Sequence, residues 1–357
     1  MLQKETIRQK LSAVPTVARY GSEMETPLHS MLGLRALVET MAELGVPART
    51  LLAGTGISPN LLGDSQARIS VRQKIKLFSN VQRFTPDPAI GLMAGQRQRI
   101  SDLGVFGYAI LSSATFGKAI DFGIRHVRLA GPVIEKSFRV EGDVAIFEGH
   151  DTIDLDDLLP IASEFWFGSM QSLISHTLGR TFDAHRLLLP YPAPAHAHRY
   201  SEFLGYPVEF DAPVMQWHFD ASMLDLPLPA ANPIMAEVST GFCARMLEDI
   251  RGEHELIKQI KEACLNSVGG IPGLEDMASR LNQSTRTLQR RLMEAGCRYQ
   301  DVIDDVRRRL AIEYLERTTM SVEQVAERSG FSDVSNFRKA FKKWTGRTTA
   351  YYRARRH

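Results

Sequence analysis

Apolar residues recur at helical spacing through much of the chain as far as residue 178. The first such stripe predicts a helix that begins at Leu28 and ends before Gly45 and Pro47. Its apolar positions are Leu32, Leu34, Leu37, Val38 and Met41. Further helices are predicted over about 71–84 and 88–97, as two short helices within 106–130 that break near Ser112–Thr115, and over 155–178.

The period changes from helical to alternating after residue 132. Apolar and polar positions alternate over 133–140 and again over 144–150, on either side of the pair Gly142-Asp143. Two alternating runs around such a turn predict a β-hairpin. Short strands are also predicted between proline-rich turns, over 186–189, 207–210 and 214–219.

These elements divide the chain into an arm and two domains. Residues 1–27 are polar and weakly periodic, which predicts a loose N-terminal arm. Residues 28–230 predict an α+β domain with a small antiparallel sheet. A connecting helix or linker is expected over 231–252, and every pattern over 253–357 is helical, so the second domain is predicted to be all-α.

The C-terminal domain contains an internal repeat. The segment LEDMASRLN (274–282) resembles VEQVAERSG (322–330), and the similarity continues into the helix that follows each copy. Each copy reads as helix, short turn, helix. Ser284 is expected to cap the second helix of the first copy, while Gly330 ends the first helix of the second copy and Ser332 or Asp333 caps the next. Two such copies predict two helix-turn-helix motifs.

Both second helices are amphipathic when their residues are placed at ~100° intervals. In the first, Thr285, Leu288 and Leu292 are expected to face inward, and the outward positions are Arg286, Gln289, Arg290 and Met293. In the second, the apolar face holds Val334, Phe337, Phe341 and Trp344, and the opposite face holds Ser335, Arg338, Lys339 and Lys342. Arg and Gln pair with guanine and adenine edges in the major groove. A lone surface helix also shows such residues to water, but two matched helices favour DNA binding.

One uninterrupted helix is predicted between the two motifs, over 299–318. About 19 helical residues span ~28 Å, and neighbouring major-groove sites on one face of DNA are ~34 Å apart. A stiff helix of this length is therefore suited to hold two reading helices in successive grooves. Its residues Arg307, Arg308 and Arg309 either contact phosphate or pair with acidic neighbours, namely Asp304, Asp305 and Glu313.

The distribution of charge supports a polyanionic partner. Residues 253–357 hold 20 Lys/Arg and 14 Asp/Glu, a balance of +6, whereas the rest of the chain holds 23 and 27, a balance of −4. A basic C-terminal segment after a mildly acidic remainder is typical of a protein that binds nucleic acid through that segment. The alternative is that the basic residues form a solvated tail. The length of 357 residues fits about two domains of ~150 residues.

The C-terminal motifs closely resemble those of AraC-family transcription regulators. The similar segments are STRTLQRRLMEAG, RRRLAIEYL and SVEQVAERSGFSDVSNFRKAFKKWTGRTTAYYR, within about 260–355. The resemblance implies a seven-helix domain with two helix-turn-helix units joined by a long helix. It implies base-reading roles for Arg286, Gln289 and Arg290 in the first unit and for Ser335, Asn336 and Lys339 in the second. The family's usual proline after the last Gly is absent from GRTTAYYR, which is expected to affect only the entry to the last helix.

The N-terminal domain resembles the sensor domain of one AraC branch, over about 35–225. The similar segments are LLGDSQARIS, DPAIGLMAGQR, LGVFGYAILSSATFGKAI and FLGYPVEFDAP. This domain is conventionally called arabinose-binding-like, which does not imply an arabinose ligand, and the resemblance carries over no ligand residues. Aromatic residues here are core by default, and some are candidates to line a pocket: Phe106, Tyr108, Phe165, Trp166 and Trp217.

Other chemistry is not favoured by the residues present. His185, His196 and His198 lack the spacing of a metal site, and DTIDLDDL (151–158) lacks the Gly and final Glu of a calcium loop, so no metal or cofactor is expected. An enzyme with a reactive Cys, such as a methyl-accepting repair protein, is disfavoured because residues 1–242 contain no Cys. A nucleoid-type structural binder is the other alternative, and it leaves the α+β domain unexplained.

The sequence therefore predicts a DNA-binding transcription regulator and no enzyme. We expect a sequence-specific activator that is controlled by a small-molecule effector bound in the N-terminal domain. The expected partners are promoter DNA, RNA polymerase and a second copy of the chain as a homodimer. Three cysteines fit a reducing cytoplasm, no secretory signal or membrane-spanning segment is expected, and catalytic residues are expected to be absent.

Overall fold

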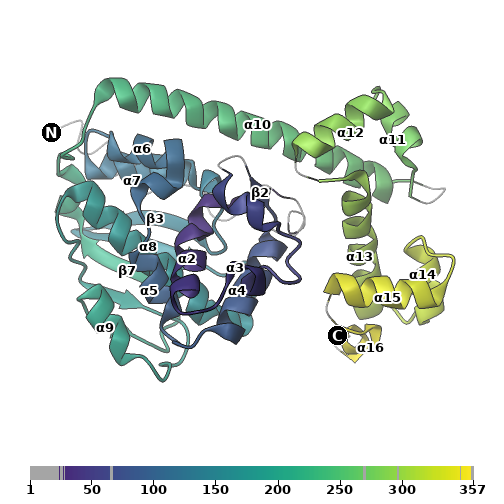
Figure 1. Ribbon diagram of the computed structural model, residues 1–357, viewed down its shortest axis with the longest axis horizontal. Coiled ribbons are helices and arrows are strands. Elements are labelled where there is room, and N and C mark those ends of the chain that lie inside the picture. Colours follow the sequence, from purple (N-terminus) through teal and green to yellow (C-terminus); the bar gives the residue numbers. More distant parts are fainter. Residues whose placement is uncertain are drawn as a thin grey trace. The chain divides into compact units, whose positions relative to one another are not determined.

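The structure, a computed structural model, describes residues 24, 27, 29–64, 67–267, 271–295, 297–345 and 347–354. Apart from residues 24 and 27, the predicted N-terminal arm lies outside these residues. The chain divides into two compact units, Leu28–Asp249 and Ile250–His357, which are described separately below (Figure 1).

The first unit contains eight α-helices among its described residues, together with a five-stranded sheet. The α-helices are α2 (Arg35–Glu43), α3 (Ala48–Leu51), α4 (Val71–Phe84), α5 (Ile90–Gln96), α6 (Gly104–Leu111), α7 (Phe116–Arg125), α8 (Leu159–Leu178) and α9 (His198–Leu204). Short 3-10 turns connect them: η2 (Leu32–Leu34), η3 (Pro59–Gly63), η4 (Ile100–Leu103), η5 (Val127–Leu129), η6 (Asp156–Leu158) and η7 (Ala221–Asp225). The predicted helix over 71–84 and the break near Ser112–Thr115 agree with α4 and with the gap between α6 and α7.

The predicted start of the first helix at Leu28 is wrong. Strand β1 (His29–Ser30) pairs instead with β2 (Arg68–Ile69), and α2 begins only at Arg35, after η2. The backbone groups of His29 and Ser30 are therefore satisfied by a distant strand, which local periodicity does not reveal. Within α2 the predicted apolar stripe is buried, including Leu37 and Met41.

The sheet contains the predicted hairpin and three later strands. Its members are β3 (Glu135–Glu141), β4 (Val144–His150), β5 (Arg186–Leu188), β6 (Val208–Glu209) and β7 (Met215–Asp220), in the order β3-β4-β7-β5-β6. Neighbours are antiparallel except β5 and β6, which are parallel because α9 returns the chain between them. Gly142 takes a φ of 59° at the hairpin turn, a conformation that favours glycine.

Helix α8 supplies the core of the first unit. One face meets the sheet, where Phe167 lies edge-on to Trp217 with ring centroids 5.9 Å apart. Another face meets α5 so closely that a Cβ on Gly95 would come within 2.7 Å of the backbone nitrogen of Ser169. Phe165 joins the second apolar cluster, which is formed with α2, α3 and α4. Because two clusters share α8, the helix holds the sheet and the N-terminal helices together.

The predicted aromatic core residues divide into two groups. Trp217, Trp166, Phe165 and Phe106 are buried, as expected. Tyr108 is 51% exposed on α6, so its assignment to the core is wrong.

The second unit is helical throughout its described residues. Helix α10 (Pro233–Leu265) spans the boundary between the units, and α11 (Leu274–Arg280), α12 (Thr285–Glu294), α13 (Tyr299–Arg317), α14 (Val322–Arg328), α15 (Val334–Thr345) and α16 (Thr349–Ala354) follow. Within the segment 231–252, predicted as a connecting helix or linker, the helix begins at Pro233 and runs on to Leu265, since Gly252 alone does not break it.

Helix α13 is shared by two separate apolar clusters. Val302, Ile303 and Val306 belong to the cluster that also holds Leu288 of α12. Ala311 and Leu315 belong to a second cluster, which also holds Phe337 and Phe341 of α15. Each half of α13 thus completes the core of one motif.

Two substitutions on α12 test which of its faces is buried. We expect Leu288→Ala to destabilise the second unit by about 2–5 kcal/mol, because it leaves a cavity in a fully buried site. Met293→Ala, on the same helix but 74% exposed, should change the free energy of unfolding by less than about 0.5 kcal/mol. Amide hydrogen exchange of the full chain measures both. Equal protection in the two variants would mean that the face of α12 is assigned wrongly.

Candidate DNA interface and ligand cavity

Local hydrogen bonds shape the first helix-turn-helix motif, α11 and α12. Gln283 N–H donates to the carbonyl oxygen of Ala278, and Asn282 adopts a φ of 53° in the turn. The Ser284 hydroxyl then accepts from the backbone N–H of Thr287 at 3.1 Å, which caps α12 as predicted. Ala278 is buried, and its small side chain suits the close contact of the two helices.

The second motif, α14 and α15, follows the same plan. Ser321 and Gln324 form a capping box at the start of α14, and Gly330 ends the motif's first helix at a φ of 83°. The sequence left Ser332 and Asp333 open as the next cap. The structure selects Asp333, whose Oδ1 accepts from the backbone N–H of Asn336 at 2.7 Å.

The second helix of each motif buries its apolar face and exposes its polar face. Leu288, Leu292, Phe337 and Phe341 are buried. The candidate DNA-contacting residues are all exposed: Arg286, Gln289, Arg290, Ser335, Asn336, Arg338, Lys339 and Lys342. The arrangement leaves both sets free to meet a large ligand, although their roles in DNA binding stay predictions.

Two of these exposed side chains already form ion pairs. Arg290 contacts Glu294 at 2.8 Å, and Arg338 contacts Glu323 at 3.5 Å. Exposed pairs of this kind contribute about 0–1 kcal/mol, so phosphate or base edges can replace the carboxylates at little cost.

The three arginines of α13 contact other residues of the second unit. The guanidinium of Arg307 lies over the Phe331 ring, 5.2 Å from its centroid. Arg308 and Arg309 contact the buried carboxylate of Asp305 at 2.6 and 3.4 Å, and Lys261 of α10 contacts it at 2.6 Å. Burial alone would raise the pKa of Asp305, but the three cations hold it below its ordinary value.

The closing Tyr-Arg pair of the chain fastens α16 to the second motif. The ring of Tyr352 lies edge-on to Phe341 at 5.3 Å. Arg353 donates to the carbonyl oxygens of Leu315, Thr318 and Met320, just where α13 ends. Helix α16 forms without the family's usual proline and begins at Thr349.

A cavity of about 180 Å³ lies inside the first unit. It is partly open and is lined by residues of α4, α6, α7, α8 and the start of the β3–β4 hairpin, most of them aliphatic or aromatic. Phe106, Phe165 and Trp166, which the sequence offered as core or pocket residues, line it. The volume is slightly larger than that of an engineered cavity of ~150 Å³ that binds benzene.

Two lysines also line this cavity, and sequence reasoning missed both. Lys74 of α4 is buried and donates from Nζ to the carbonyl oxygen of Gly131. Lys136 of β3 is partly buried, with Nζ 5.2 Å from the centroid of the Trp166 ring. Burial, helped by the charge of Lys136, lowers the pKa of Lys74 to about 7, and burial lowers the pKa of Lys136 to about 8.

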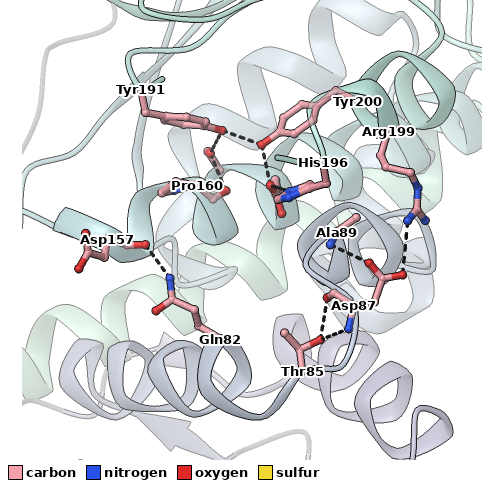
Figure 2. A network of polar contacts seen from close by, with 12 residues as sticks. Gln82, Thr85, Asp87, Ala89, Asp157, Pro160, Tyr191, His196, Arg199 and Tyr200 are labelled. Atoms are coloured by element: carbon pink, nitrogen blue, oxygen red, sulfur yellow. Dashed lines mark hydrogen bonds and ion pairs between the residues drawn. The ribbon is translucent and has the colours of Figure 1, made fainter. Parts of the chain in front are cut away.

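A buried polar network occupies another side of α8 (Figure 2). Glu164 Oε1 accepts from the Tyr200 hydroxyl at 2.6 Å and contacts His196 Nε2 at 2.7 Å. The Tyr191 hydroxyl continues the network to Ser163 at 2.6 Å and to Tyr200 at 3.2 Å. Desolvation raises the pKa values of both tyrosines, so they stay protonated donors. The network ties α9 and the loop before it to α8.

The described residues contain no group of three His, Cys, Asp or Glu side chains placed to hold a metal ion. His196 pairs with Glu164, and His185 and His198 are exposed. The three cysteines are buried, and burial raises the pKa values of Cys243 and Cys264 to about 11. In the part of the chain that the structure covers, no helix is long and apolar enough to span a membrane.

Comparison with known proteins agrees with this architecture. Residues 45–228 match the family described as the arabinose-binding domain of AraC transcription regulator, and residues 277–355 match a helix-turn-helix domain. The chain is 34% identical over 321 residues to the ornithine utilization regulator of Pseudomonas aeruginosa, covering 89% of this chain and 94% of that protein. It is 28% identical over 279 residues to the regulator VqsM of the same organism, covering 74% and 83%. The crystal structure of the regulator CdpR from P. aeruginosa aligns with a TM-score of 0.45 at 23% identity, covering 90% and 98%.

The fold and these similarities define a helix-turn-helix transcription regulator that binds DNA, and not an enzyme. The chain belongs to the AraC family, with the arabinose-binding type of N-terminal domain.

The buried ion cluster around Asp305 yields a stability prediction. Asp305→Asn should destabilise the second unit by about 3–5 kcal/mol, because it removes the buried carboxylate that Lys261 and Arg308 both contact. Glu313→Gln makes the same charge change on an exposed side chain of α13 and should cost less than about 0.5 kcal/mol. Amide hydrogen exchange in the full chain reads both.

The same cluster gives the sign of the pH dependence. Because the pKa of Asp305 is lowered, its contribution is present above its ordinary value of 3.8 and is lost as the pH falls through the lowered value. Equal stability of Asp305→Asn and Glu313→Gln at neutral pH would contradict this assignment.

Proposed function

We propose that the protein is a sequence-specific transcription activator whose DNA binding is controlled by a small molecule in the first unit. The observation that carries this proposal is the presence of two matched helix-turn-helix motifs in one unit and of a mainly apolar cavity in the other. Ligand sites are typically concave and apolar with a few polar groups, which describes this cavity. The proposed division is 28–230 for sensing and dimerisation, 231–252 as connector and 253–357 for DNA binding, with 1–27 as an arm.

Within the DNA-binding domain, we assign base reading mainly to α12. Arg286, Gln289 and Arg290 have the hydrogen-bonding groups that pair with guanine and adenine. In α15, Ser335, Asn336 and Lys339 occupy the matching positions, while Arg338 and Lys342 add positive charge for phosphate. The second helix offers fewer paired donors, so it is suited to hold phosphate more than to read bases.

The exposed face of α10 supports a homodimer. Ile234, Met235, Val238 and Phe242 are between 44% and 74% exposed, and they follow one another at helical spacing. A contiguous apolar stripe on the surface of a protein marks an interaction surface, and a second copy of the same helix is the partner that matches it.

The exposed stripe is tested by analytical sedimentation of the full chain. Val238→Glu places a charge within the stripe and is expected to yield monomers, whereas Glu237→Gln should leave the assembly unchanged.

RNA polymerase is the remaining proposed partner, since an activator acts on the enzyme at a promoter. Transcription takes place where the chromosome lies, so the cytoplasm is the proposed compartment. The name of one relative connects that protein with ornithine utilisation. For this chain we do not carry ornithine over as the effector, because a cationic ligand would meet the ammonium groups of Lys74 and Lys136.

The reading helix is tested by binding to a DNA site selected by the full chain. We expect Arg286→Ala and Gln289→Ala each to weaken specific binding by about 1–3 kcal/mol and to relax preference at one or two base pairs. Arg317→Ala removes the same charge outside the reading helices, and we expect it to leave base preference unchanged. Binding isotherms on the site and on its single-base variants are the measurement.

Two results of that experiment would count against the proposal. If both variants keep the wild-type DNA affinity and base preference, α12 is not the helix that reads the bases. A diffuse footprint with no discrete site would favour a nucleoid-type structural binder.

A further inference from the structure

Both cavity lysines occupy positions where the pattern of their element requires an apolar residue. Lys74 lies on the same face of α4 as Phe78 and Val81, which are buried. Lys136 lies on the same face of β3 as Phe138, also buried, because alternate residues of a strand share a face. Burying an ammonium group is costly unless it is paired. Two lysines at positions of this kind, from separate elements, line the same cavity.

The described lining of the cavity supplies no countercharge. It includes Lys74 and Lys136 but no Asp or Glu. Among the described residues, the ammonium group of Lys74 donates to the carbonyl oxygen of Gly131, and that of Lys136 lies over the face of the Trp166 ring. Glu135 adjoins Lys136 along β3 and only partly offsets its loss of solvation.

Further polar groups in the lining are also unsatisfied. The hydroxyl of Ser169 and the indole Nε1 of Trp166 are buried and have no hydrogen-bond partner within the described residues. Both residues come from α8 and line the same cavity as the lysines. The polar side chains of the lining, which also include Gln98 and Thr177, contain no carboxylate, and most of the remaining wall is hydrocarbon.

We propose that the ligand of this cavity is a small hydrophobic monocarboxylate, held by the ammonium groups of Lys74 and Lys136. Its hydrocarbon body would lie against the apolar wall formed by residues such as Phe106, Ile120 and Phe165. This inference rests on the proposed function, in which the cavity binds the effector, and it names the chemical class of that effector.

The chemistry of the cavity disfavours the other ligand classes. A cation would be repelled by two like charges, and a neutral ligand would bring no countercharge to the two ammonium groups. A polyol or a phosphorylated sugar would place many hydroxyl groups against hydrocarbon. A carboxylate with a short chain or a single ring pairs the charges, and it fits a volume of about 180 Å³.

The test uses the full chain and two pairs of ligands that have the same shape and differ in charge. Octanoate and 3-phenylpropanoate are compared by isothermal titration calorimetry with octanamide and 3-phenylpropanamide. We expect at least one carboxylate to bind and its amide to bind at least tenfold more weakly. Lys74→Met and Lys136→Met should each weaken carboxylate binding at least tenfold. Lys76→Met, an exposed lysine on the same helix as Lys74, should leave it unchanged.

Melting curves of the variants separate binding from folding. Methionine is apolar and similar in length, so we expect Lys136→Met to melt near the wild-type temperature while losing carboxylate binding. This second variant keeps the test valid if Lys74→Met loses stability with its hydrogen bond to Gly131.

The remaining outcomes overturn the inference in distinguishable ways. Equal binding of acid and amide, or unchanged binding in both lysine variants, removes the anion assignment and leaves an effector cavity. If neither carboxylate binds while a neutral or cationic metabolite stabilises the chain, only the chemical class is wrong. If no metabolite of any charge stabilises the chain or alters its DNA binding, the proposed function fails as well.

Discussion

The DNA-binding unit depends on the division of one helix between two cores. The first half of α13 packs through Val302 and Val306 against the motif that contains α12, and the second half packs through Leu315 against the motif that contains α15. Neither motif buries its apolar face without α13. The buried Asp305 fixes this helix to α10 through Lys261. Helices α12 and α15 therefore belong to one packed unit, and their separation is set by a helix of ~28 Å.

Features that arise within one segment could be predicted from the sequence. The hairpin around Gly142 and the faces of α12 were readable because period, cap and turn residues are local signals. The start of α2 was not, because His29 pairs with Ile69 across the intervening helices. The cavity was not readable either, since its walls come from separate elements. A signal for its lysines was present: Lys74 interrupts an apolar helix face, and Lys136 interrupts an apolar strand face.

The cations discussed in the two units differ in their exposure to solvent. On α12 and α15, cations stand in water, where they can exchange weak partners for a polyanion. In the cavity, Lys74 and Lys136 lie among mainly apolar residues, and burial lowers their pKa values to about 7 and 8. The described chain passes from the first unit to the second through α10.

We propose that α13 holds α12 and α15 at a fixed spacing on DNA, and a change in the spacing of the DNA site tests this proposal. Base pairs are inserted between the two contacted segments of a selected site, and the affinity of the full chain is measured. Five inserted base pairs turn the second segment through about half of the ~10–10.5 base-pair helical repeat, to the opposite face of the duplex. Because a stiff α13 cannot follow this rotation, we expect at least a tenfold loss of specific affinity, whereas salt-sensitive non-specific binding should be retained. Unchanged specific affinity would contradict it.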